Sequence, residues 1–112
     1  MAVPTMIDGE VTRNVGTRIV HDDDKIRIWE LNLAPGEQTD PHEHVHDYII
    51  IILEGDRIAA VPHPKSTGES ASLIDVECEG GGFYVMKKGG IETALNTGKK
   101  YFKELLIELK DR

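Results

Sequence analysis

Three of the five histidines in this 112-residue chain, His42, His44 and His46, occupy alternate positions. An aliphatic run over residues 48–53 follows them almost at once and stops before Gly55. Because side chains on a strand alternate between its two faces, a regular strand would place all three imidazoles on one side. Imidazoles gathered beside an apolar strand are typical of a metal site. The alternative is the polar face of an exposed strand.

The overall composition limits the classes of function. A net charge of −7 and a pI near 5.1 argue against nucleic-acid binding, which needs a basic patch, and against attachment to an anionic membrane. No apolar run reaches the roughly 18–20 residues of a membrane-spanning helix. The first ten residues do not resemble a signal peptide. The single cysteine, Cys78, cannot form an internal disulfide, so we expect a cytoplasmic protein with a buried structural thiol.

Turn signals recur every 8 to 12 residues or so, which is typical of an all-β sandwich or barrel. We expect a single domain over residues 1–112, with an N-terminal arm or edge strand over 1–14 and a loop over 62–70. Residues 54–56 are expected to form a hairpin turn. Residues 100–110 suit a helix or a closing strand, and the all-β context favours the strand. The other strands are predicted at 15–21, 25–33, 48–53, 57–61, 72–77, 83–86 and 91–95.

Two spaced motifs connect these elements. In the first motif, Gly36 is followed by five residues and then by the sequence His42-Glu43-His44, and the motif ends at Gly55. In the second, Gly81 leads to Gly89, then to Glu92 and Asn96. The spacing resembles that of the cupin superfamily, in particular its small single-domain (cupin 2) members, over about residues 27–109. The resemblance implies a jelly-roll barrel, the double-stranded β-helix.

The chain departs from the usual cupin pattern at three positions. Tyr48 stands where the family has Glu, Lys87 where it has Pro, and Glu92 where it has His. Typical cupins bind a divalent metal through three His and one Glu. The resemblance therefore implies that His42, His44 and Glu92 are the metal ligands here, with the carboxylate moved from one strand to another.

Two imidazoles and one carboxylate are the ligand composition of non-haem Fe(II) sites, and Mn, Ni or Zn can occupy the same ligands. His46 is either a further ligand or points away at a kink. We expect Tyr48 or His46 to orient a small polar or carboxylate substrate or to move a proton; whether the protein is an enzyme stays open. Alternatively, the exchanged positions mark a lapsed metal site that binds a small ligand without catalysis.

The aliphatic run also predicts a protein partner. If Tyr48, Ile50 and Ile52 point into the barrel, then Ile49, Ile51 and Leu53 point outward, and a strand that is apolar on both faces is normally buried on both. A second subunit would cover the outer face, which predicts a homodimer. The alternative is that the chain's own N-terminal segment covers it.

Overall fold

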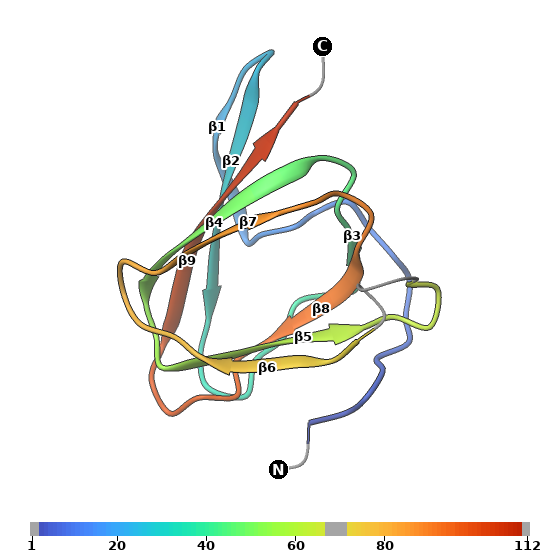
Figure 1. Cartoon of the computed structure of the whole chain (residues 1–112), viewed down its shortest axis with the longest axis vertical. Coiled ribbons are helices and arrows are strands. Elements are labelled where there is room, and N and C mark those ends of the chain that lie inside the picture. Colours follow the sequence, from blue (N-terminus) through green and yellow to red (C-terminus); the bar gives the residue numbers. More distant parts are fainter. Residues whose placement is uncertain (1–2, 67–71, 111–112) are drawn as a thin grey trace.

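The computed structural model describes residues 3–66 and 72–110, which form nine β-strands and no helix (Figure 1). Within this part of the chain there is accordingly no helix that could span a membrane. The all-β prediction is confirmed, and the C-terminal segment is a strand rather than a helix. The strands are β1 (Arg18–Asp22), β2 (Ile26–Leu33), β3 (His42–Glu43), β4 (Asp47–Glu54), β5 (Arg57–Pro62), β6 (Ile74–Glu77), β7 (Phe83–Met86), β8 (Ile91–Leu95) and β9 (Phe102–Leu109).

The strands form two antiparallel sheets that face each other (Figure 1). One has the order β1-β2-β9-β4-β7 and the other the order β3-β8-β5-β6. The predicted hairpin over residues 54–56 is wrong, because β4 and β5 lie in different sheets and do not pair. The turn instead carries the chain across the barrel, and its Gly55 has a φ of 138°, a conformation that favours glycine. The predicted loop over 62–70 lies partly outside the described residues.

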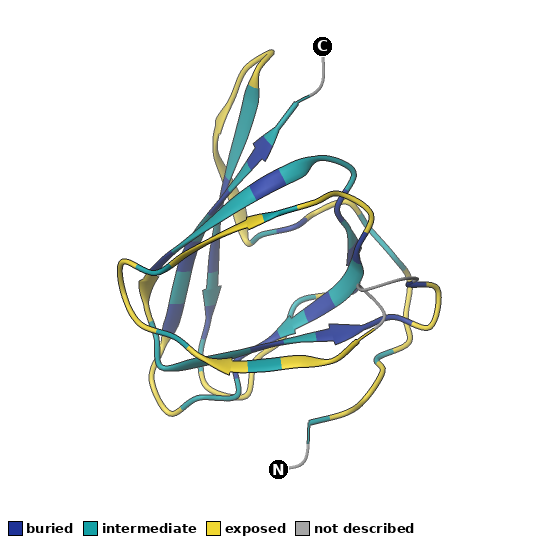
Figure 2. Ribbon diagram, viewed as in Figure 1, coloured by how far each residue is buried: buried dark blue, intermediate teal, exposed yellow. Residues whose placement is uncertain are grey.

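The core lies between the two sheets, where the inward side chains alternate along each strand. On β9, which is central in its sheet, Phe102, Glu104, Leu106 and Glu108 are buried, while the residues between them are half-buried (Figure 2). Tyr48 and Ile52 on β4 are buried beside them, as predicted for the inward face. The barrel interior therefore contains two glutamates from a single strand, which the sequence does not make obvious.

A short loop after β8 closes the base of the barrel. The Asn96 amide donates to the carbonyls of Leu33 and Lys100, both at 2.9 Å, and its oxygen accepts from the Gly98 amide at 2.9 Å. The side chain is 1% exposed. Asn96 thus joins the ends of β2, β8 and β9.

Candidate metal centre

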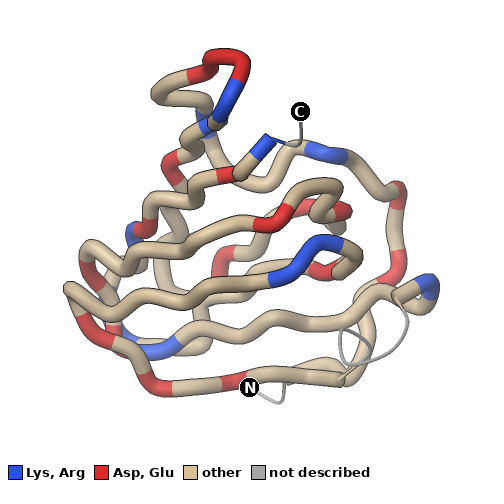
Figure 3. The backbone as a smooth tube through the Cα atoms, turned by 45° about the horizontal axis from the view of Figure 1, so that its top comes forward, with Lys and Arg blue, Asp and Glu red and all other residues tan. Residues whose placement is uncertain are grey.

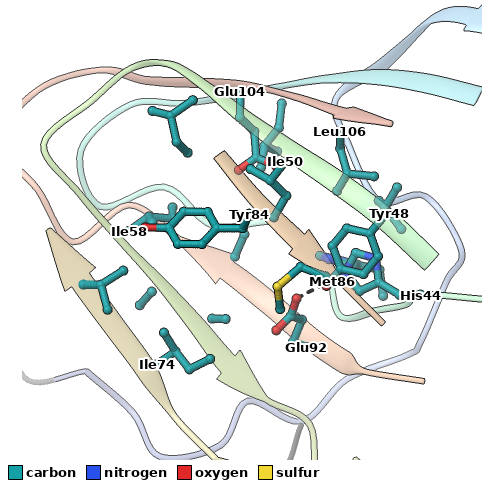
Figure 4. Close-up of a pocket in the computed structure, with 18 residues that line it drawn as sticks. His44, Tyr48, Ile50, Ile58, Ile74, Tyr84, Met86, Glu92, Glu104 and Leu106 are labelled. Carbon is teal, nitrogen blue, oxygen red and sulfur yellow. Dashed lines mark hydrogen bonds and ion pairs between the residues drawn. The ribbon is translucent and has the colours of Figure 1, made fainter. Parts of the chain in front are cut away.

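The three predicted metal ligands come together inside the barrel. Figure 4 labels two of them, His44 and Glu92. His42 on β3 is the direct cross-strand partner of Glu92 on β8, and His44 follows β3 immediately. One ligand atom from each of the three residues lies within 4.8 Å of the other two. We call His42, His44 and Glu92 the triad. The pairing of β3 with β8 accounts for the convergence of residues that are some fifty positions apart.

The three-histidine strand is shorter than expected. Strand β3 ends at Glu43, and His44 is then held by the loop before β8: its amide donates to Gly90 O at 2.9 Å, and its carbonyl accepts from Gly89 N at 2.8 Å. The chain next bends at His46 and enters β4 in the opposite sheet. Because the strand does not continue, the alternation rule no longer applies at His46. That residue is outside the triad and does not line the central cavity.

Hydrogen bonding determines which nitrogen of His42 is free. His42 Nδ1 lies 2.9 Å from the carbonyl oxygen of Asp40. A carbonyl only accepts, so Nδ1 carries the proton and Nε2 keeps its lone pair. This arrangement, in which one ring nitrogen donates to a backbone carbonyl, is the usual support for a metal-binding histidine. Burial, and next the charge of His44, lower the pKa of His42, so its ring is neutral at pH 7.

His44 and Glu92 are hydrogen-bonded to each other, with Nε2 and Oε1 3.2 Å apart. Burial by itself would raise the pKa of Glu92, but the hydrogen bond from His44 and the charges of both imidazoles lower it overall. The carboxylate is therefore ionised at neutral pH. His44 Nδ1 is buried and has no hydrogen-bond partner within residues 3–66 and 72–110. The pair thus offers a carboxylate oxygen and an imidazole whose second nitrogen is unsatisfied.

Tyr48 covers the imidazole of His44. The two rings are stacked, with centroids 3.9 Å apart and an interplanar angle of 10°. Tyr48 is 3% exposed and lines the cavity, and its hydroxyl makes no hydrogen bond within the described residues. Burial, followed by the charges of Glu92 and Glu104, raises the pKa of the phenol. The hydroxyl is consequently a hydrogen-bond donor at any physiological pH and is not a base.

The triad and Tyr48 border a cavity of about 180 Å³ between the sheets. Its walls are mainly aliphatic, with Ile50, Ile52 and Leu106 from one sheet and Ile58 and Ala94 from the other. Three further lining residues are partly exposed, at 43% for Ile74, 37% for Val76 and 40% for Tyr84. They lie on β6 and β7, the edge strands at the same end of the two sheets. The cavity therefore opens between these edges.

The donor set suits a divalent metal ion. Two ligand atoms bound about 2.1 Å from a tetrahedral ion lie roughly 3.4 Å apart, close to the 3.2 Å between His44 Nε2 and Glu92 Oε1. The oriented lone pair of His42 Nε2 is available, and an ion bound by His44 Nε2 and Glu92 would take the place of the proton that these two groups share. Two nitrogens and one oxygen match ions such as Fe, Mn, Ni and Zn. The residues present thus fit the group that the sequence motif implies.

Glu104 is a cavity residue that the sequence analysis missed. It lies on β9 and is 4% exposed. The only signal in the sequence is the alternation of β9, and this signal points the wrong way, since Leu105, Ile107 and Leu109 are the more apolar set. Burial, and next the charge of Glu92, raise the pKa of Glu104 from 4.5 to about 8.

Solved structures share this architecture. The sequence matches no family model and no curated protein. A cupin domain from Bordetella pertussis Tohama I is similar, with a TM-score of 0.68 and 20% identity over 92% of this chain and 99% of that one. A cupin superfamily protein from Desulfitobacterium hafniense DCB-2 has a TM-score of 0.61 and 20% identity, covering 91% and 84%.

A third structure is a conserved protein with a double-stranded β-helix domain from Klebsiella pneumoniae. Its TM-score is 0.63 at 16% identity, with coverage of 86% of this chain and 78% of that one. At these identities the likeness concerns the fold alone. The two-sheet architecture and these similarities confirm the predicted fold class: the chain has the cupin fold, a double-stranded β-helix barrel.

Proposed function

We propose that this protein binds one divalent metal ion in its barrel through His42, His44 and Glu92. The observation that carries the proposal is the convergence of three ligand atoms, within 4.8 Å of one another, on the wall of the cavity between the two sheets. Fe, Mn, Ni and Zn are all compatible with the donor set. When bound, such an ion supplies Lewis-acid chemistry to a small polar or carboxylate substrate in the cavity.

The chain's own residues then orient the substrate. The neutral hydroxyl of Tyr48, fixed by stacking on His44, donates a hydrogen bond to a substrate oxygen. The aliphatic walls exclude water around it. The orienting role predicted for His46 requires this side chain to reach a cavity that it does not line, so the proposal assigns the role to Tyr48.

Elemental analysis of protein purified without chelator tests the metal site. We expect about one equivalent of metal per chain in the wild type, and a loss of at least tenfold in His44→Ala. His21→Ala is the matched control, because His21 is exposed and pairs with Asp23 outside the cavity. Protein that is metal-free and takes up neither Zn(II), Fe(II), Mn(II) nor Ni(II) on reloading would contradict the proposal.

A second candidate is a non-catalytic protein that binds a small ligand with no metal present. It is favoured by the apolar cavity walls and by Tyr48 at the family's carboxylate position. It predicts that a ligand raises the melting temperature in EDTA, and that Glu92→Gln reduces this shift. If the ligand raises the melting temperature only when metal is added, this candidate is wrong and the result supports the metal proposal.

We further propose that the protein forms a homodimer through the outer face of the five-stranded sheet. Strand register places eight outward residues in two rows across four strands, and seven of the eight are apolar. Val85 and Phe83 are 71% and 67% exposed. Figure 3 shows that β7 and the middle of β4 carry no charged residue. The rows are Ile28, Ile107, Ile49 and Val85, and Glu30, Leu105, Ile51 and Phe83.

The N-terminal segment does not supply the alternative cover. Val3 and Ile7 pack against a cluster on the four-stranded sheet, and the Ile7 amide donates to Pro62 O at 3.1 Å. Contiguous apolar surfaces of this kind mark interaction sites. A second copy is the simplest occupant, since one patch can serve both partners of a two-fold dimer.

The molar mass in solution tests the dimer. Light scattering after size exclusion should give twice the chain mass for the wild type and a single chain mass for Phe83→Lys. Met6→Lys is the control, because Met6 is 54% exposed but belongs to the N-terminal segment. A monomeric wild type at micromolar concentration would refute the proposal.

A further inference from the structure

Glu104 is a buried carboxyl that faces the cavity and has no partner in the part of the chain that the structure describes. It is 4% exposed and lies between two buried aliphatic residues on the adjacent strands, Leu31 on β2 and Ile52 on β4. Its side chain lines the cavity (Figure 4). Among the described residues, no group forms a hydrogen bond with the carboxyl.

Such a group is unusual in a protein interior. A polar group taken from water without a replacement hydrogen bond destabilises the fold, and most buried polar side chains do have a partner. Leucine would fill this position in an aliphatic wall with no such penalty. The Glu104 carboxyl lies at the surface of an open cavity, so it can form hydrogen bonds with a molecule that enters.

The protonation state of the carboxyl selects the kind of molecule. With its pKa raised to about 8, Glu104 is mainly neutral at pH 7. It then presents one O–H donor and one C=O acceptor. A hydroxyl group satisfies both at once and a carbonyl satisfies the donor, whereas an ammonium group pairs best with the ionised carboxylate, which is the minor form at pH 7.

The position of Glu104 gives the cavity a second polar end. Two members of the triad, His42 and Glu92, belong to the four-stranded sheet, whereas Glu104 belongs to the five-stranded one. Tyr48, which stacks on His44 of the triad, lies four residues along β4 from Ile52, the cross-strand partner of Glu104. The wall between these two levels is formed by Ile50 and Leu106. Two polar ends are thus separated by an apolar middle.

We propose that Glu104 recognises a hydroxyl or carbonyl group at the far end of a small, mostly apolar molecule whose other end carries an oxygen bound at the triad. The second half of this inference rests on the proposed metal function. The cavity of about 180 Å³ admits a molecule somewhat larger than benzene, which occupies apolar cavities near 150 Å³. Glu104 is therefore a specificity-determining residue for the ligand class.

Three six-carbon probes with the same carboxylate end test the assignment: 6-hydroxyhexanoate, hexanoate and 6-aminohexanoate. Their affinities are measured by calorimetry with Zn(II)-loaded wild type, Glu104→Leu and Glu104→Gln. In the wild type we expect the hydroxy acid to bind roughly 2- to 10-fold more tightly than hexanoate, as for one added hydrogen bond. Glu104→Leu should lose this preference. Glu104→Gln should keep it, because an amide also donates and accepts.

Four results would overturn the proposal: equal affinities of the hydroxy acid and hexanoate in the wild type, tightest binding of the amine, an unchanged preference in Glu104→Leu, or no binding of any probe. Equal affinities of the hydroxy acid and hexanoate would mean that Glu104 has only a structural role. Metal content is measured separately, so a protein that holds none of Zn(II), Fe(II), Mn(II) and Ni(II) refutes the metal function by itself. In that case the ratio of the affinities for 6-hydroxyhexanoate and hexanoate, measured again in EDTA, still tests the role of Glu104.

Discussion

Replacing Glu104 by glutamine should change how stability depends on pH. In the native state burial, and next the charge of Glu92, raise the pKa of Glu104 to about 8, against an ordinary value of 4.5. Between these values the folded protein holds a proton that the unfolded chain releases. The free energy of unfolding of the wild type therefore falls as pH rises through this window. Glu104→Gln is nearly isosteric and cannot titrate, so it lacks this dependence.

The size of the effect follows from the shift. Each unit of pKa shift corresponds to about 1.4 kcal/mol, so the wild type should lose about 3.5 kcal/mol relative to Glu104→Gln between pH 5 and pH 8. The other titratable groups lining the cavity are common to both proteins, so their contributions largely cancel in the difference. They are His42, His44, Tyr48, Tyr84 and Glu92.

Urea unfolding at pH 5, 6, 7 and 8 measures the difference. Trp29 is the only tryptophan and is 5% exposed in the core, so its fluorescence reports the transition. Glu77→Gln, an exposed glutamate on β6, is the matched control and should track the wild type at every pH. A wild-type curve that stays parallel to that of Glu104→Gln across this range would refute the burial of Glu104 as an uncompensated carboxyl.

Three further changes test the framework of the site. Asn96→Ala removes three hydrogen bonds from the base of the barrel and should lower the free energy of unfolding by on the order of 2 kcal/mol in urea titrations. Gly55→Ala places a Cβ 2.7 Å from Phe102 Cδ1 at positive φ, so its melting temperature should fall further than that of Gly36→Ala, where nothing lies within 4 Å. Tyr48→Phe keeps the ring stacked on His44 and should retain metal content by elemental analysis, while calorimetry shows weaker binding of 6-hydroxyhexanoate.

Much of the fold was predictable because its signals are local. Turn residues at regular intervals indicate short antiparallel strands, and glycines at fixed offsets mark the sharp turns of a jelly roll. The same spacing, compared with the cupin motifs, predicted that His42, His44 and Glu92 come together. Their meeting depends on the β3–β8 pairing, which brings Glu92 opposite His42.

The prediction for His46 shows where local rules stop. Alternation holds only while a strand continues, and β3 ends at Glu43 because the next residues cross to the other sheet. The hairpin expected over residues 54–56 differs from the structure for the same reason. Nothing in the local sequence tells whether a turn connects neighbours in one sheet or carries the chain between two.

The sequence by itself determined the all-β class, the two-motif spacing, the ligand types and an aliphatic strand with two apolar faces. Only the tertiary structure decided which face of β9 points inward. By hydrophobicity, Leu105, Ile107 and Leu109 should face the core, yet Glu104 and Glu108 do, because β9 lies between β2 and β4 and must follow their register. Glu108 is matched by the Trp29 indole, which donates to it at 2.6 Å, whereas Glu104 is left facing the cavity. Register is a property of the assembled sheet, so no local pattern in this segment could reveal that carboxyl.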